Sequence, residues 1–323
     1  MSITRSQISD SYLSNNELRP LDMRRDLIEV ADLIELCFSD TLDRDGRQYI
    51  AQIRAAAKNP KILGFPEFVG NSLAGFVWED KGRIIGNISL IPVQALQQRA
   101  YLIANVAVHP DHRRKGIANA LTNAALAYIK NRKIHSVWLQ VNSNNPAAIH
   151  LYQSAGFLER ARRTTWHSRS GTKPKVSSHK KVLVTSRKKR DWPLQREWLN
   201  RVYPGEVKWH LPINTQAFSP GLAGKFNRLM NERKIKQWSA RLDNQLIGTL
   251  SWQSSTGMAD WLWLATTPDY ENLTIQSLLP YVLDLLRKKR LLSINYLAGH
   301  SVDSFQNAGF INHRTLIWMH LYI

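Results

Sequence analysis

The chain has 323 residues, of which 43% are hydrophobic and 21% charged, ordinary globular proportions that exclude a disordered, collagen-like or disulfide-stapled protein. Lysine and arginine outnumber aspartate and glutamate by 44 to 25, which gives a formal charge of +19. The length favours two domains of roughly 150 residues each.

Cysteine usage and hydropathy bear on where the protein works. Cys37 is the single cysteine, so we expect no internal disulfide and no cysteine-based metal site, as is typical of the cytoplasm. The first ten residues lack the apolar core of a signal peptide, and no run approaches about 18 apolar residues. We therefore expect a cytoplasmic protein with no membrane partner.

The strands and helices expected in the first half alternate along the chain. Apolar spacing predicts helices over residues 27–37, 49–57, 117–130 and 146–154. Strands are predicted at 74–78, 84–91, 101–108 and 137–141, the first two forming a hairpin. This alternation predicts the α/β fold class, with a largely buried central sheet.

The positive charge is concentrated in one place. Twelve of the lysines and arginines lie between Arg160 and Arg190, a stretch without aspartate or glutamate. Its Ser, Gly and Pro content predicts a basic connector over 169–190, between a domain at 1–168 and another at 191–323. The connector could be a plain solvated linker, or it could attract an acidic partner or a nucleic acid.

The second half repeats the first. Three blocks recur in the same order: 85–90 (IGNISL) as 247–252 (IGTLSW), 109–112 (HPDH) as 267–270 (TPDY), and 153–157 (QSAGF) as 306–310 (QNAGF). We interpret the chain as two diverged copies of one fold.

A basic, glycine-containing loop follows the strand that ends at Val108. It leads into the helix predicted from Ile117, so the amides from Arg114 to Asn119 point out of a helix N-terminus, where anions such as a pyrophosphate bind. Gly116 allows close backbone approach, and Arg113, Arg114 and Lys115 add charge. A plain solvated turn is the alternative.

Two motifs of the first copy carry a family resemblance. Residues 113–118 (RRKGIA) fill the pattern Gln/Arg-x-x-Gly-x-Gly/Ala, and residues 145–157 (NPAAIHLYQSAGF) match Asn-x-x-Ala-x-x-x-Tyr-x-x-x-Gly-Phe. In this order and spacing they resemble the GNAT superfamily of N-acetyltransferases. The resemblance implies two GNAT-like domains in tandem, each a mixed sheet with splayed middle strands flanked by helices.

The same resemblance implies an activity and site residues. It implies direct transfer of an acetyl group from acetyl-CoA to a primary amine in a ternary complex, without a metal. Tyr152 would protonate the departing thiolate. The resemblance also implies three groups of acetyl-CoA-binding residues. The strand backbone would pair with the pantetheine arm, the loop would hold the pyrophosphate, and an asparagine would contact the arm. These residues are, in that order, Val106, Ala107 and Val108; Arg113, Arg114, Lys115, Gly116, Ile117, Ala118 and Asn119; and Asn145.

No general base is assigned. Many family members carry a carboxylate on the strand before the loop, but residues 100–108 contain none. Glu35 or Asp40 could reach the site, a water chain could serve, or the acceptor amine could be less basic. His109 and His112 lie on the loop, where a solvated or phosphate-facing role is more typical.

The second copy lacks the loop residues and the tyrosine that the resemblance implies for acetyl-CoA chemistry. Glu271 stands where the first copy has Arg113, Thr274 replaces Gly116, and Phe305 replaces Tyr152, so we expect it to bind no acetyl-CoA. Eight of the eleven tryptophans lie there, and Trp261 and Trp263 are expected to pack in its core, an aromatic binding surface being the alternative.

Two other functions are compatible with the sequence. One is a nucleic-acid- or ribosome-associated protein that uses the basic connector. The other is aminoacyl transfer from a charged tRNA, known for other duplicated relatives of this fold, although the intact pyrophosphate loop argues against it.

Overall fold

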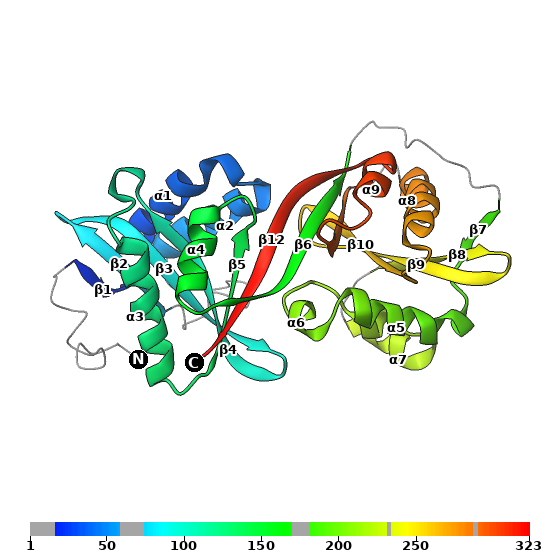
Figure 1. The fold of residues 1–323 in the computed structure, drawn as a ribbon, viewed down its shortest axis with the longest axis horizontal. Helices are drawn as coiled ribbons and strands as arrows, with labels where there is room; N and C mark the ends of the chain where they lie inside the picture. Colours follow the sequence, from blue (N-terminus) through cyan, green and yellow to red (C-terminus); the bar gives the residue numbers. More distant parts are fainter. Residues whose placement is uncertain (1–16, 59–73, 170–180, 231–233, 287–289) are drawn as a thin grey trace. The chain divides into compact units, whose positions relative to one another are not determined.

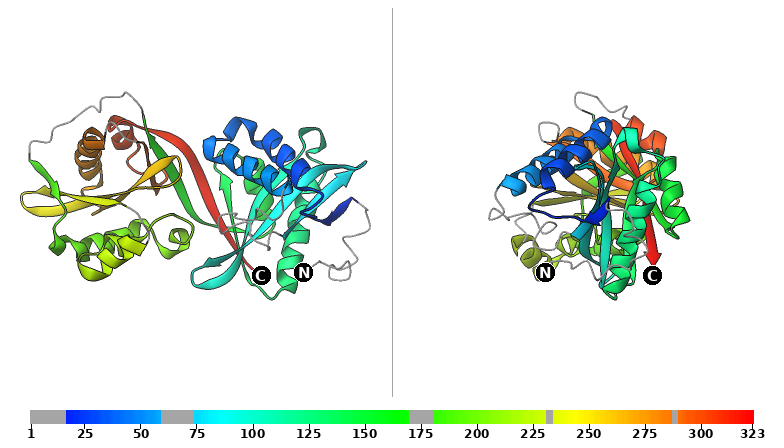
Figure 2. Two further views of the ribbon diagram at one scale, coloured as in Figure 1. Left: turned by 180° about the vertical axis from the view of Figure 1, so that it is seen from behind. Right: turned by 90° about the vertical axis from the view of Figure 1, so that its left-hand side faces the viewer.

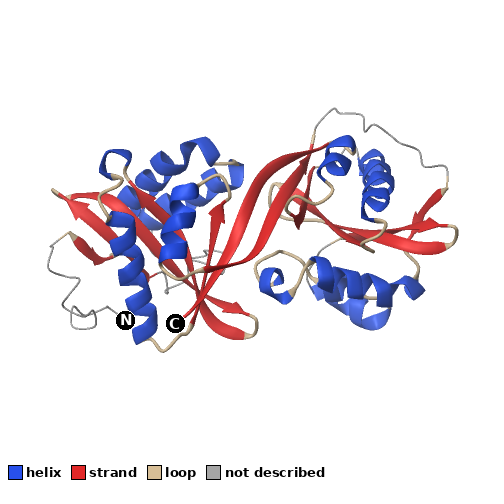
Figure 3. Cartoon of the chain, viewed as in Figure 1, coloured by secondary structure: helices blue, strands red, loops and turns tan. Residues whose placement is uncertain are grey.

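A computed structural model describes residues 17–58, 74–169, 181–230, 234–286 and 290–323. The chain divides into two compact units, one formed by residues 1–160 together with 317–323 and the other by residues 161–316. In both units helices flank the strands of a mixed sheet (Figure 3), which confirms the predicted α/β class.

In the described part of the first unit, the strands β1 to β5 come from its own half of the chain. Its elements are β1 (Leu18–Pro20), α1 (Leu27–Phe38), α2 (Arg44–Lys58), β2 (Ala74–Asp80), β3 (Arg83–Ala95), β4 (Gln98–Val108), α3 (Ile117–Asn131), β5 (Ser136–Asn142) and α4 (Pro146–Ser154). Strands β1 to β4 pair antiparallel in chain order, and β5 pairs parallel to β4. Helices α3 and α4 pack on one face of this sheet, and α1 and α2 pack on the other (Figures 1 and 2).

The second unit repeats this order. Its elements are β6 (Leu158–Ser168), β7 (Val182–Ser186), α5 (Trp192–Val202), α6 (Gly205–Lys208), α7 (Gly221–Met230), β8 (Ile235–Leu242), β9 (Gln245–Gln253), β10 (Ala259–Thr266), α8 (Glu271–Leu286), β11 (Leu291–Leu297), α9 (Val302–Asn307) and β12 (Phe310–Tyr322). The succession β8-β9-β10-α8-β11-α9-β12 matches β2-β3-β4-α3-β5-α4-β6, including a parallel pair at β10 and β11. The repeat read from the sequence therefore has a structural counterpart.

The last strand of each copy joins the sheet of the other copy. Residues 163–167 of β6 pair antiparallel with β11, in the second unit. The end of β12 returns to the first unit, where the Ile323 N–H donates to His135 O at 2.9 Å and Ile317 and Met319 join the core that also contains Tyr152. The observed division at residues 160 and 317 thus differs from the expected boundaries at 168 and 191.

Part of the expected connector is regular structure. Residues 182–186 form β7, an edge strand that pairs antiparallel with β8, and Lys189–Asp191 form a 3₁₀ turn before α5. The expectation of a solvated connector over 169–190 is wrong for this portion, because alternate residues of β7 are half-buried against the second unit's core. Residues 170–180 lie outside the described residues. The acidic partner or nucleic acid expected at the connector stays a prediction.

Each unit has its own core. Trp263, Leu262 and Leu264 of β10 are fully buried, which confirms core packing for Trp263, while Trp261 is partly buried and stacks on it with ring centroids 5.4 Å apart. Among the described helices, none is both long and apolar enough to cross a membrane.

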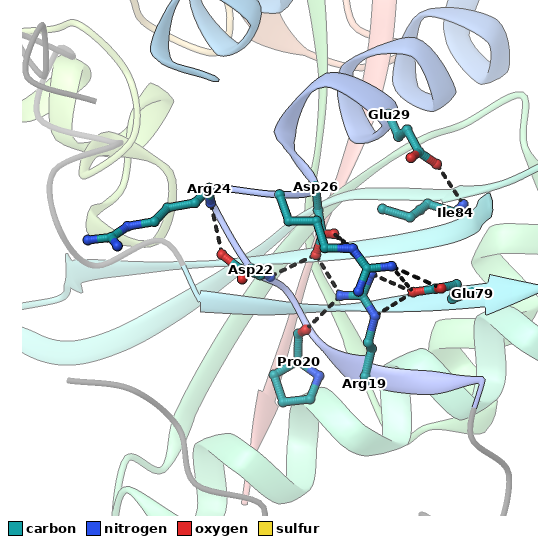
Figure 4. Close-up of polar contacts among 9 residues, drawn as sticks. Arg19, Pro20, Asp22, Arg24, Asp26, Glu29, Glu79 and Ile84 are labelled. Atoms are coloured by element: carbon teal, nitrogen blue, oxygen red, sulfur yellow. Dashed lines mark hydrogen bonds and ion pairs between the residues drawn. The ribbon is translucent and has the colours of Figure 1, made fainter. Parts of the chain in front are cut away.

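An ion-pair cluster joins β1 and the turn before α1 to β2 (Figure 4). Arg19 on β1 donates to both carboxylate oxygens of the buried Asp26, at 2.6 and 2.9 Å, and to Glu79 on β2 at 2.7 Å. Arg25 also reaches Glu79, at 3.0 Å, and the Ile84 N–H donates to Glu29 at 3.0 Å. These contacts hold β1 and the first turn of α1 against β2 and β3.

Candidate functional site

The loop between β4 and α3 has the geometry expected of an anion site. Arg114 and Gly116 both adopt positive φ, +62° and +81°, and turn the chain so that α3 begins at Ile117. A Cβ built on Gly116 would meet no atom within 4 Å, so the backbone is open on that side. The first amides of a helix have no partner within the helix and carry the positive end of its dipole.

The side chains of this loop point to different surroundings. Arg114, Lys115 and Asn119 are exposed, whereas Ile117 is buried in the core and can offer a ligand only its backbone. Arg113 is exposed, but its Nε donates to Val108 O at 3.2 Å, so this guanidinium lies against the end of β4.

Strands β4 and β5 separate before β4 ends. Their parallel pairing runs from Ala100 with Ser136 to Ile103 with Leu139, and the rest of β4 continues to Val108 without a partner on β5. The predicted binding residues Val106, Ala107 and Val108 all lie beyond the last paired residue. The splayed strands expected from the resemblance are therefore present, and they leave a backbone edge near the start of α3.

A β-bulge shapes this same part of β4. The register between β3 and β4 shifts by one residue between the pairs Asn87–Ala107 and Ser89–Ala104. Asn105 occupies the bulge with φ +52°, and the buried Asn87 amide donates to its carbonyl oxygen at 2.8 Å. Bulges of this kind reorient strand amides and are frequent beside active sites.

Tyr152 and Asn145 differ in exposure. The Tyr152 side chain is 6% exposed, lies in the core of the first unit and meets Phe157 edge-to-face at 6.0 Å. Burial raises the pKa of Tyr152, so the phenol keeps its proton at neutral pH, as a proton donor must. Asn145 is exposed and caps α4, its side-chain oxygen accepting from the Ala148 N–H at 3.0 Å.

The side chains considered as a general base have separate partners and do not form one cluster. Glu35 is bound by Arg54 at 2.5 Å, and Asp40 is exposed and accepts from the Ser39 hydroxyl at 3.4 Å. The His109 and His112 rings meet edge-to-face at 5.7 Å, and His112 Nδ1 lies 3.9 Å from an Asp80 carboxylate oxygen. The described residues hold no group of three or more His, Cys, Asp or Glu side chains that could bind a metal ion.

The sequence reading missed a polar cluster between α2 and the bulge. The side chains of Tyr49, Asn87, Ser89 and Asn105 lie within hydrogen-bonding distance of one another, and we call them the bulge cluster. Cys37 was also missed as a neighbour of the site: its thiol donates to Val108 O at 3.3 Å, and burial raises its pKa. The sequence offered one sign of this cluster, namely the polar residues Asn87 and Ser89 on the otherwise apolar strand β3.

The corresponding region of the second unit is closed by its own side chains. Pairing of β9 with β10 shows no register shift, and no described residue from Thr267 to Thr274 has a positive φ. The buried Tyr203 hydroxyl accepts from the Leu264 N–H at 3.3 Å, beyond the last residue of β10 that pairs with β11.

In the second unit, the residues that stand in place of Arg113, Gly116 and Tyr152 make contacts with other parts of that unit. Glu271 accepts from the Ser301 hydroxyl at 2.7 Å, Thr274 is buried beside Ile247, and Phe305 stacks on Trp166 at 4.9 Å. These residues serve packing and capping in the second unit.

Comparison with known proteins assigns the first unit to a family. Residues 28–157 match the model of the acetyltransferase (GNAT) family, a span that includes the splayed strands, the loop and Tyr152. This part of the chain is a GNAT acetyltransferase domain. The chain is 35% identical over 91 residues to spermidine N(1)-acetyltransferase of Vibrio cholerae, a match that covers 28% of this chain and 51% of the relative.

A second curated relative and a solved structure are also similar to this chain. The [ribosomal protein bS18]-alanine N-acetyltransferase of Escherichia coli is 38% identical over 63 residues, covering 20% of this chain and 43% of the relative. The chain thus spans about half the length of the curated relatives it matches. A GCN5-related N-acetyltransferase from Sphaerobacter thermophilus has the same fold over 94% of this chain and 95% of its own, with a TM-score of 0.55 at 12% identity.

Proposed function

We propose that the protein is an acetyl-CoA-dependent N-acetyltransferase in which an amine attacks the thioester directly, within the first unit. One observation carries this proposal: the same loop and strand combine an open, left-handed Gly116 at the start of α3 with a β4 edge that β5 leaves unpaired. A pyrophosphate fits the former and an extended, amide-containing pantetheine arm fits the latter.

The residues present fit acetyl-CoA. The amides from Arg114 to Asn119, with the exposed Arg114 and Lys115, would hold the pyrophosphate. The backbone of Val106 to Val108 would bind the arm and offer an amide to the thioester oxygen, where negative charge develops. Asn87 would act through the backbone, because its bond to Asn105 O holds the bulge that orients these amides.

Tyr152 would supply the proton that the thiolate takes as the C–S bond breaks. A thiol of pKa about 8.5 is already a tolerable leaving group, so this proton is worth only about 10²-fold in rate. The second unit would bind no acetyl-CoA, since Tyr203 occupies the place where its strands separate.

Calorimetric titration with acetyl-CoA tests the proposal. The full chain is expected to bind with a micromolar Kd, and Gly116→Glu is expected to abolish binding, because a side chain and a negative charge would enter the pyrophosphate site at a positive φ. Thr274→Ser, at the matching position of the second unit, is the control and should leave the Kd unchanged. The proposal fails if the unaltered chain shows no binding at millimolar acetyl-CoA.

A further inference from the structure

The bulge cluster adjoins the strand backbone to which the acetyl group would be bound, because its Asn105 directly precedes Val106. Asn105 Nδ2 donates to the Tyr49 hydroxyl oxygen at 2.8 Å and lies 3.3 Å from Ser89 Oγ. Asn87 Nδ2 donates to Asn105 O at 2.8 Å and lies 3.4 Å from Ser89 Oγ. The cluster is a connected network of neutral groups that α2, β3 and β4 assemble.

The direction of these hydrogen bonds leaves the O–H groups of Tyr49 and Ser89 without an acceptor among the described residues, and of the two only Tyr49 is partly exposed, since Ser89 is buried. The Tyr49 oxygen already accepts from Asn105, and its own O–H donates to no described residue. Burial raises the pKa of Tyr49, so the proton stays on the phenol at neutral pH. Tyr49 therefore keeps a hydrogen that it can donate to an acceptor oxygen.

The charge around this donor is equally informative. Its one partner is the Asn105 amide, and the next group of the cluster is the Ser89 hydroxyl; both are neutral and cannot balance an ammonium ion. Of the described acidic groups on the neighbouring α1 and the turn after it, Glu29 accepts from the Ile84 N–H, Asp32 and Glu35 are both bound to Arg54, and Asp40 is exposed. The other titratable groups near the end of β4 are Cys37, whose thiol is bonded to Val108 O, and His109 and His112 on the loop.

Such a site favours an amine that is already partly neutral. An α-amine next to a carbonyl has a pKa of about 7.7–8.0, whereas an alkylamine has one near 10.4. At pH 7.5 roughly a third of the former but only about a thousandth of the latter is neutral, a difference of about 300-fold in reactive amine. The carbonyl of an α-amino acyl group also supplies the oxygen that Tyr49 requires.

We infer that the acceptor is the α-amine of a peptide or other aminoacyl group, whose carbonyl oxygen accepts the free hydrogen of Tyr49, and that no carboxylate among the described residues removes its proton. The inference rests on the proposed function. In the step itself the amine nitrogen forms the C–N bond as the C–S bond breaks; the nitrogen releases a proton to water, and Tyr152 gives one to sulfur and regains it from water.

The test uses the full chain, saturating acetyl-CoA and release of free thiol. Acceptors are a set of tripeptide amides with free N-termini and varied first residues, the same set N-terminally blocked but carrying one lysine, and spermidine. At pH 7.5 the free α-amines are expected to react with kcat/KM about 10²-fold above the lysine and spermidine amines. The profile of kcat/KM against pH should break near the pKa of each acceptor.

Tyr49→Phe separates positioning from packing. It is expected to raise KM for the α-amine peptides about three- to tenfold, with kcat and the acetyl-CoA Kd nearly unchanged, and to leave spermidine kinetics unaffected. Tyr281→Phe, at a half-exposed tyrosine of α8, is the matched control and should change nothing.

The inference is overturned if spermidine or lysine amines react as well as α-amines, if the profile breaks at one pH for acceptors of different pKa, or if Tyr49→Phe leaves every KM unchanged. Acetyl-CoA binding without thiol release from any α-amine peptide also overturns it. Failure of the proposed function is distinct, because it shows as absent acetyl-CoA binding in the calorimeter.

Discussion

Tyr152 shows how a single residue combines packing with chemistry. Its ring is buried among the apolar side chains of the first unit, and that burial keeps its hydroxyl protonated. The motif in residues 145–157 located this tyrosine, because its spacing from the following glycine lies within one helix and one turn. Its environment depended on Phe157 and on the distant Met319, which no local pattern reveals.

Tyr152→Phe is the prediction at this scale. We expect kcat with an amine acceptor to fall about 10²-fold while the acetyl-CoA Kd stays within about twofold, because only the proton donor is lost. Steady-state kinetics and calorimetry measure the two effects. Tyr101→Phe, another tyrosine buried in the same core, serves as the control, and an unchanged kcat in Tyr152→Phe would reduce this residue to a packing role.

At the scale of single elements, the local sequence pattern predicted some helices and strands correctly and missed others. Helix α4 begins and ends as predicted, since Pro146 starts it and Gly156 follows it with φ +91°. Strand β7 was missed, because an edge strand needs little apolar character and its residues stand among lysines and serines. The bulge was missed as well, because an extra residue in β4 is visible only against its partner β3.

The cluster that holds β1 and α1 on the sheet predicts an acid sensitivity. Hydrogen bonding to Arg19 lowers the pKa of Glu79, so its ion pairs stabilise the fold above the ordinary pKa near 4.5 and are lost as pH falls through the lower, folded value. Because solvent screens this partly exposed carboxylate, we expect Glu79→Gln to lower the free energy of unfolding by no more than about 1 kcal/mol at pH 7, and we expect the stability of this variant to fall less steeply than that of the unaltered chain below pH 4.5.

Urea titrations at pH 7 and pH 4 measure this effect. Asp40→Asn, at an exposed carboxylate of the same unit, is the control and should leave both values within about 0.5 kcal/mol of the unaltered chain. An equal loss for Glu79→Gln at both pH values would show that the ion pairs do not carry the pH dependence.

For the whole molecule, the decisive feature is the return of the chain end to the first unit. Ile317, Trp318 and Met319 are each at most 2% exposed, and His135 Nδ1 lies 2.6 Å from Ile323 O. The GNAT domain therefore depends on residues at the far end of the sequence, which the family match over 28–157 does not include.

Removal of residues 317–323 tests this dependence. Each buried side chain removed costs about 2–5 kcal/mol, so the total approaches the stability of an ordinary domain. We expect the truncated chain to lose its cooperative thermal transition in the first unit and its binding of acetyl-CoA. Tyr322→Ala, which removes a side chain that is 70% exposed, should retain both; an intact transition after truncation would contradict the prediction.

The sequence by itself determined the α/β class, the duplication and the loop at Gly116, because each depends on spacings within one strand, helix or turn. Only the tertiary structure decided which unit receives β12, since an alternating strand pattern records burial and says nothing of the neighbouring strand. It likewise assembled Tyr49, Asn87 and Asn105, whose hydrogen bonds join parts of the chain up to 56 residues apart. Long-range pairing of this kind leaves no periodic trace in the sequence.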